Sequence, residues 1–229
     1  MKSDVPKQCL PLGGHPVIFW AVHAFATCTV VDSIVVVVPG RDDRVKMMLG
    51  EYAFAKPVDF VSGGSRREDS VRAGLDALPQ DTDYIIVHDG ARPLVTEDII
   101  QRAVAKAFGC GAAIVAVPAA DTIKVVNERG TIVSTPPRET LWLAQTPQVF
   151  RKDLLVRAYA APRRCGFVAS DDALLVELLG EEIAVVQGAE ENVKITTPLD
   201  LAIAEAVLVA RMARTETGVI QDRLRRRES

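Results

Sequence analysis

The first candidate for chemistry is a polar stretch that directly follows a short apolar run. Residues 84–87 are Tyr-Ile-Ile-Val, and they continue into His88-Asp89-Gly90-Ala91-Arg92-Pro93. In an open parallel sheet, ligands bind at the carboxyl edge of the strands. We therefore expect Asp89 at the mouth of a binding crevice, where a carboxylate can organise a magnesium ion or a sugar hydroxyl. An ion pair between Asp89 and Arg92 that closes the turn explains the same residues.

A second candidate combines glycines, serines and cations. Residues 62–70 are Ser-Gly-Gly-Ser-Arg-Arg-Glu-Asp-Ser, and they follow another apolar run and open a helical stretch. Glycines before a helix N-terminus favour an anion-binding or base-binding turn, although such turns are also common without a ligand. Lys7, Arg138 and Lys194 stand beside proline or threonine in loop-like contexts. A lone lysine of this kind is usually a solvated surface group.

These residues need a scaffold, and the hydrophobic pattern predicts one. Short runs rich in β-branched residues indicate buried strands at 33–38, 58–61, 84–87, 112–117 and 183–186. Helical spacing occurs at 17–27, 44–52, 67–78, 97–108, 153–160, 171–179 and 199–212. Strands that alternate with helices predict an α/β fold with a doubly wound, mostly parallel sheet. We expect one domain over residues 1–229.

One segment interrupts this alternation. Residues 121–134 show a strand, then Asn127-Glu128-Arg129-Gly130, then a second strand, which predicts a β-hairpin. With its flanks, it forms a β-arm over about residues 119–142. Such an arm could dock on a second subunit, and a plain surface hairpin is the alternative.

Composition excludes several classes of function. Apolar residues make up 48% and charged residues 25% of the 229 positions, as in ordinary globular proteins and unlike disordered ones. The formal net charge is −3, so no broad basic surface favours nucleic acid or anionic lipid. We expect neither partner, and any polyanion that binds should be small and held by a few cations.

The cysteines, the histidines and the first residues bear on disulfides, metal sites and the cellular compartment. Cys9, Cys28, Cys110 and Cys165 lie far apart without a Cys-x-x-Cys pair, which favours core thiols over disulfides or zinc. The three histidines have no ligand spacing, so we interpret them as structural and expect no metal site built from protein side chains. The first residues contain no signal-like apolar stretch, and no apolar run is long enough to span a bilayer. We therefore expect a cytoplasmic protein.

Together these stretches resemble the 2-C-methyl-D-erythritol 4-phosphate cytidylyltransferase family, from about residue 3 to about residue 211. Each motif alone is weak, but seven occur in family order. They are Pro6-Lys7-Gln8, Gly63-Gly64 with Asp69-Ser70-Val71, His88-Asp89-Gly90-Ala91-Arg92-Pro93, Asp121-Thr122-Ile123-Lys124, Thr146-Pro147-Gln148, Ser170-Asp171-Asp172 and Asn192-Val193-Lys194-Ile195-Thr196.

The resemblance implies a nucleotidyltransferase, Rossmann-like sheet with a projecting β-arm. It also implies transfer of the cytidylyl group of CTP to 2-C-methyl-D-erythritol 4-phosphate, with release of pyrophosphate, in isoprenoid precursor synthesis. Mg²⁺ would accompany CTP, and a homodimer would form through the arm. Two alternatives remain. The chain could transfer the cytidylyl group to another polyol phosphate such as ribitol 5-phosphate, or it could be an inactive dimerisation or regulatory module.

The resemblance also implies roles for individual residues. Lys7 would stabilise the negative charge on the triphosphate while the α-phosphorus is attacked. The nucleotide would contact Gly64, Ser65 and Ser70. The acceptor would contact Asp89, Arg92, Thr122, Arg138, Ser170 and Lys194. Because the family's arm completes the neighbouring site, Thr122 and Arg138 would act across the dimer.

The start of the chain departs from the family pattern. Family members open with a hydrophobic strand and a glycine-rich loop ending in an arginine, before the stretch that Met1 to Gln8 matches. We therefore expect this strand, triphosphate loop and arginine to be missing here, either because the natural protein starts upstream or because the chain is a remnant. On this expectation, the chain as it stands turns over little.

Overall fold

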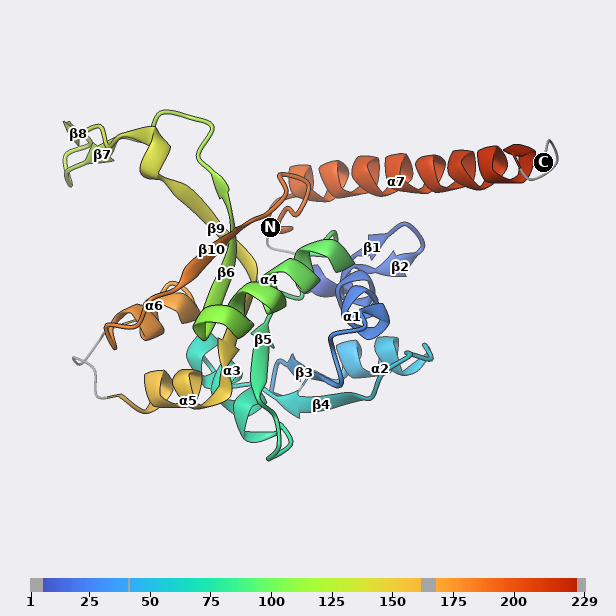
Figure 1. The fold of residues 1–229 in the computed structure, drawn as a ribbon, viewed down its shortest axis with the longest axis horizontal. Coiled ribbons are helices and arrows are strands. Elements are labelled where there is room, and N and C mark those ends of the chain that lie inside the picture. Colours follow the sequence, from blue (N-terminus) through green and yellow to red (C-terminus); the bar gives the residue numbers. More distant parts are fainter. Residues whose placement is uncertain (1–5, 41, 162–167, 226–229) are drawn as a thin grey trace.

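The computed structural model describes residues 6–40, 42–161 and 168–225, with side chains as far as residue 214; Cys165 lies outside this part (Figure 1). The strands are β1 (Pro11–Leu12), β2 (His15–Pro16), β3 (Ile34–Val38), β4 (Val58–Ser62), β5 (Tyr84–Val87), β6 (Ala112–Pro118), β7 (Val125–Val126), β8 (Ile132–Ser134), β9 (Trp142–Arg151) and β10 (Ala184–Gln187). The α-helices are α1 (Val17–Thr27), α2 (Arg44–Gly50), α3 (Arg67–Asp76), α4 (Glu97–Cys110), α5 (Lys152–Ala160), α6 (Asp172–Glu177) and α7 (Pro198–Arg225), and the 3-10 helices are η1 (Lys7–Cys9) and η2 (Arg138–Thr140).

The strands that the hydrophobic runs predicted form two groups. Strands β10, β6, β9 and β5 make one sheet in that order, and β3 and β4 make a separate parallel pair. Strands β10 and β6 are also parallel, as expected, while β9 runs antiparallel to both of its neighbours. All five predicted strands and all seven predicted helices are present; α1 and β5 match their predicted ranges, and the others have shifted ends. The largest shift is in α7, which continues to Arg225 instead of 212.

Strand β9 was not predicted from the sequence. Its middle contains Pro147, and a proline argues against a central strand because it cannot donate a ladder hydrogen bond. The register between β6 and β9 shifts between Ile114 and Ala116, which pair with Gln148 and Ala144. Pro147 lies within this irregularity, where the ladder does not need its missing N–H. The bulge therefore explains how a proline fits a strand that lies between two partners.

The β3–β4 pair and the larger sheet are not joined by strand hydrogen bonds. A cavity of about 880 Å³ lies between β3 and β5. Most of its walls are apolar side chains from these strands and from α1 and α3, but Ser70, Asp89 and Lys194 also contribute. The cavity therefore reaches the carboxyl end of β5, where the sequence predicted a binding crevice.

Helices cover both faces of the larger sheet. On one face α4 packs against β6, β9 and β10, and α1 packs against α4; Ile100, Ala103 and Val149 lie in this core. On the other face α5 and α6 pack around Phe150 and Leu155. The sheet is therefore the middle layer of an α/β/α arrangement, which fixes the ends of its strands as one rigid edge.

Two elements project from this body (Figure 1). The arm carries β7 and β8, which pair antiparallel, and it leaves the body through β6 and β9. Helix α7 projects from another side and packs its first turns against β1. Across the described part of the chain, no helix combines the length and apolar character that crossing a bilayer requires.

Burial of β9 predicts a large stability effect at Phe150. This side chain has no exposed surface, whereas Phe108 on α4 is 61% exposed. We expect Phe150→Ala to lower the free energy of unfolding by about 3–5 kcal/mol, because the lost contacts leave a cavity. The control Phe108→Ala should cost no more than about 1 kcal/mol. Urea denaturation measures both, and equal losses would contradict the packing described here.

Candidate active site

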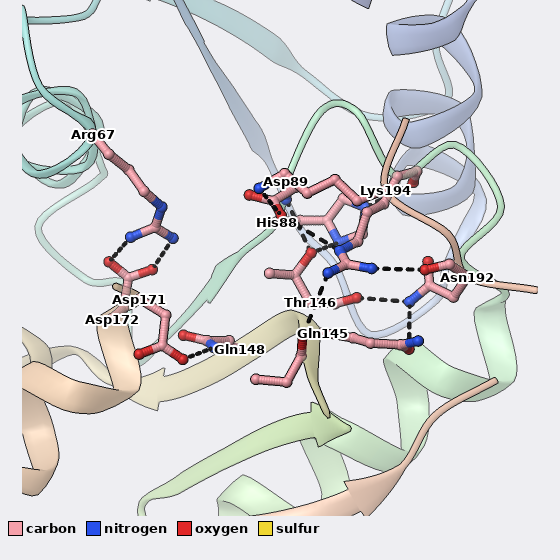
Figure 2. A network of polar contacts seen from close by, with 12 residues as sticks. Arg67, His88, Asp89, Gln145, Thr146, Gln148, Asp171, Asp172, Asn192 and Lys194 are labelled. Carbon is pink, nitrogen blue, oxygen red and sulfur yellow. Dashed lines mark hydrogen bonds and ion pairs between the residues drawn. The ribbon is translucent and has the colours of Figure 1, made fainter. Parts of the chain in front are cut away.

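A carboxylate and two cations lie together at the carboxyl end of β5 (Figure 2). The Asp89 Oδ2 atom is 2.9 Å from Lys194 Nζ and 3.4 Å from Arg92 Nε. The Asp89–Arg92 ion pair proposed as the structural alternative is therefore present, but it does not stand alone. With one negative and two positive groups, the cluster carries a formal charge of +1, which suits an anion.

The electrostatics of the cluster follow from its burial. Burial raises the pKa of Asp89, but the Lys194 hydrogen bond and the charges of Lys194 and Arg92 outweigh it, so this pKa lies below its usual value. Arg92 donates to the Asn192 carbonyl at 2.8 Å. Its side chain is 11% exposed, while that of Lys194 is 46% exposed. Lys194 is therefore the cation in this cluster that a ligand can approach most easily.

Thr146 of β9 holds the backbone of this turn in place. The Asp89 N–H donates to Thr146 Oγ1 at 3.0 Å, and the same hydroxyl lies 3.0 Å from His88 Nδ1. His88 Nε2 lies 3.0 Å from the Arg92 carbonyl, which only accepts hydrogen bonds, so Nε2 carries the proton. Nδ1 then accepts from Thr146, and the imidazole is neutral. Through these two contacts His88 helps to hold the turn.

The buried side-chain amides of Asn192 and Gln145 form hydrogen bonds next to the turn after β5 (Figure 2). Asn192 Nδ2 donates to the Thr146 carbonyl at 2.9 Å and to Gln145 Oε1 at 3.1 Å. Gln145 Nε2 donates to the Ala189 carbonyl at 2.9 Å. A Cβ at Gly188 would lie 2.6 Å from Gln145 Oε1, so the absence of a side chain there makes room for the amide. These bonds tie β9 to the segment that carries Lys194.

The glycine-serine turn forms a second part of the site at the start of α3. The Gly63 N–H donates to the Val38 carbonyl at 2.7 Å. Asp69 accepts from the Arg66 N–H at 3.2 Å, which caps the helix. A Cβ at Gly64 would lie 2.2 Å from the Cβ of Asp69, so glycine lets the turn approach the helix closely. Ser65 is exposed and Ser70 lines the cavity with Asp89 and Lys194.

Other predicted residues occupy separate places. Lys7 begins η1, one residue before Gln8, which lines the cavity. Ser170 is exposed just before α6. Thr122 and Arg138 are exposed on the arm, where Arg138 donates to the Ala120 carbonyl. The structure thus gathers Asp89, Arg92 and Lys194, with Ser70 lining the same cavity, and leaves Thr122 and Arg138 apart from them.

Several members of this network had no role predicted from the sequence. Thr146 and Asn192 fall within quoted motifs, so the signal was present, but their partners lie 46 or more positions away in the chain. Gln145 and Gly188 carried no signal beyond their identity. Arg67 and Asp172, which form a bidentate ion pair, lie in the sequence beside other candidate residues.

Comparison with known proteins identifies the fold. A crystal structure from Anaerococcus prevotii, titled 4-diphosphocytidyl-2C-methyl-D-erythritol synthase, aligns with a TM-score of 0.79 at 30% identity, and it covers 88% of this chain and 92% of that one. The structure of 2-C-methyl-D-erythritol 4-phosphate cytidylyltransferase from Thermus thermophilus gives 0.74 at 36% identity, covering 88% and 93%. These neighbours confirm an α/β nucleotidyltransferase fold.

Sequence comparison then identifies the family. The family model for 2-C-methyl-D-erythritol 4-phosphate cytidylyltransferase matches residues 1–210. The protein of that name from Pelotomaculum thermopropionicum is 44% identical over 216 residues, which is 93% of this chain and 91% of the relative. The relative from Desulforamulus reducens is 42% identical over 213 residues, covering 92% and 91%. The chain belongs to the 2-C-methyl-D-erythritol 4-phosphate cytidylyltransferase family.

The neutral imidazole of His88 predicts a pH-dependent stability. Burial lowers its pKa to about 4, from 6.5 in the unfolded chain. Below pH 6.5 the unfolded chain therefore binds more protons, and the free energy of unfolding falls as pH decreases from 6.5 towards 4. We expect His88 to contribute a loss of about 2 kcal/mol between pH 7 and pH 5.

Urea denaturation at both pH values tests this expectation. His88→Gln should remove the pH-dependent loss, because glutamine does not titrate. His23→Gln, at an exposed position on α1, is the control and should keep the loss. An unchanged slope in His88→Gln would show that other groups cause it.

Proposed function

We infer that the chain transfers the cytidylyl group of CTP to 2-C-methyl-D-erythritol 4-phosphate and releases pyrophosphate. The observation that carries this inference is the family match over residues 1–210, to which the structure adds an anion-suited cluster at the sheet edge. The relatives from Pelotomaculum thermopropionicum and Desulforamulus reducens both bear this acceptor in their names. Ribitol 5-phosphate as acceptor and a non-catalytic module are therefore not favoured.

On this proposal the acceptor phosphate binds near Lys194. A phosphate oxygen attacks the α-phosphorus of CTP in line, and the bond from this phosphorus to the bridging oxygen of pyrophosphate breaks. The attacking phosphate is already ionised, so no general base is needed. Two anions must meet, and charge-assisted contacts from Lys194 and Arg138 offset their repulsion and fix their orientation. The polyol hydroxyls then face Asp89, Thr122 and Ser170.

The nucleotide occupies the side nearer α3 in this arrangement. Gly64, Ser65 and Ser70 supply close backbone approach and hydroxyl groups for the base and ribose. Lys7 neutralises charge that builds up on the phosphorus during attack. Arg92 supports this site indirectly, because its guanidinium is committed to Asp89 and to the Asn192 carbonyl.

Mg²⁺ enters this proposal with the nucleotide. Within the described ranges, no three His, Cys, Asp or Glu side chains gather so as to hold a metal ion. Mg²⁺ that accompanies a nucleotide is bound largely by phosphate oxygens and water with one or two carboxylates, and the Asp89 carboxylate, which lines the cavity, would suit this role. When bound, the ion neutralises charge on the phosphates.

We further propose a homodimer formed through the arm. Its strands β7 and β8 expose Val125, Val126, Ile132 and Val133, an apolar surface suited to a partner. In a two-fold dimer, the arm of each subunit reaches the other subunit's site. Thr122 and Arg138, which lie apart from Lys194 within one chain, would then complete the neighbouring site.

A reducing, cytoplasmic location agrees with the cysteines. Cys9, Cys28 and Cys110 are free thiols, and the first two are buried. Oxidising compartments favour disulfides in such proteins.

Removal of either phosphate-binding cation should weaken use of the acceptor. In a protein extended by the family's N-terminal strand and glycine-rich loop, we expect Lys194→Ala and Arg138→Ala each to lower kcat/KM for the acceptor about 10- to 150-fold, from the loss of one charge-assisted contact. Arg129→Ala, at the exposed tip of the arm, is the matched control and should stay within about 2-fold. Pyrophosphate release gives the rates, and wild-type acceptor kinetics in both variants would contradict the assignment.

The dimer makes a sharper prediction when the two variants are mixed. Random mixing makes about half of the dimers heterodimers. If Arg138 acts across the dimer, each heterodimer has one intact site and one doubly damaged site. Refolding the two variants together should therefore restore about a quarter of the wild-type rate. No recovery, despite heterodimers confirmed by differently tagged subunits, would place Arg138 in the site of its own subunit.

A further inference from the structure

A fully buried carboxylate links two distant parts of the candidate site (Figure 2). Asp172, which has no exposed surface, receives hydrogen bonds from Arg67 Nη1 at 3.0 Å and Nη2 at 2.6 Å. The Tyr159 hydroxyl donates to the same carboxylate. Burial lowers the pKa of Arg67, but the bonds and charge of Asp172 outweigh it, and this pKa lies above its usual value. The Arg67 guanidinium is therefore charged.

A second bond runs parallel to this ion pair. Glu68, the next residue along α3, accepts from the Ala169 N–H at 3.1 Å. The first turn of α3 thus contacts both ends of residues 169–172, across 101 and 105 positions of the chain. Ser170 lies between these two contacts, and it is exposed.

The other end of the connection is the glycine-serine turn. Arg67 closely follows Gly63, Gly64 and Ser65, and it lines the cavity together with Ser70 and Lys194. Both of its Nη atoms are committed to Asp172, so it is a cation beside the site whose charge is already paired. Arg67 is therefore placed to influence the site through Asp172 and not by binding a ligand itself.

We propose that Arg67 is a positioning residue, which through Asp172 sets the place of Ser170 relative to the turn of residues 63–70. This proposal rests on the function inferred above and assigns to the ion pair the control of acceptor binding. The planar fork of arginine matches a carboxylate in two places, which a lysine cannot reproduce. Arginine therefore fixes both distance and angle.

The two sides of the connection differ in their other anchors. The turn keeps the Gly63–Val38 bond and the Asp69 cap without Arg67. Residues 169–172 contain Asp172, the carboxylate that the fork itself holds. Beyond α3 they are held by the Tyr159 hydroxyl, which donates to Asp172, and by Gln148, which bonds Asp171 and the Ala173 N–H. Loss of the fork should therefore displace the acceptor side and leave the nucleotide side in place.

Steady-state kinetics of Arg67→Lys in the full chain test this asymmetry. We expect the KM for 2-C-methyl-D-erythritol 4-phosphate to rise at least about 10-fold, because the positioning is lost, with the KM for CTP within about 3-fold. Tyr159→Phe, which keeps the fork, should change the acceptor KM by less than about 3-fold. Arg102→Lys, an exposed ion pair on α4, is the matched control and should change neither constant.

Hydrogen exchange supplies a readout independent of turnover. In Arg67→Lys the amides of Ala169 and Ala173 should exchange at least about 10-fold faster, while those of Ala103 and Val104 in α4 stay unchanged. Equal rises in both KM values, or a fall in kcat alone, would overturn the proposal. Absence of cytidylyl transfer, both in this chain and in one extended by the family's N-terminal strand and glycine-rich loop, would refute the proposed function instead, and unchanged exchange at Ala169 would still refute the positioning role.

Discussion

The hydroxyl of Thr146 is the interaction on which the rest of the site depends. It accepts from the Asp89 N–H and donates to His88, so one atom fixes the turn after β5 in two directions. This requires β9 to run beside β5, in the register that pairs Val87 with Gln148. Once the turn is fixed, the Asp89 carboxylate lies where Lys194 and Arg92 converge. The geometry of the cluster is thus a consequence of strand register.

The alternation of strands and helices could be predicted because local patterns determine it. Helix α1 begins and ends where its apolar spacing does, at Val17 and Thr27, and β5 matches its predicted range of 84–87. Strand β9 escaped because Pro147 is unfavourable in a strand unless a bulge accommodates it, and the bulge is a property of the pair of strands. Local sequence does not contain that information.

In the candidate site, the sequence was enough to select several residues but not the bonds that hold them. Position at a strand end was enough to select Asp89, and family resemblance selected Lys194 and Arg138. The supporting bonds were not accessible, since Arg92 with Asn192 and Arg67 with Asp172 are each separated by 100 or more positions. Polar pairs at such distances leave no periodic trace in a single sequence. Their burial makes them matter, because an unpaired charge in that setting is costly.

The wide separation of these partners has a consequence for the protein during its own synthesis. Arg92 leaves the ribosome 100 residues before Asn192, its carbonyl partner. At about 5–20 residues per second, this gap lasts about 5–20 s. During that interval the turn after β5 lacks both the backbone acceptor of Arg92 and the ammonium that pairs with Asp89. The binding edge therefore forms late in translation, after the strands that surround it have been made.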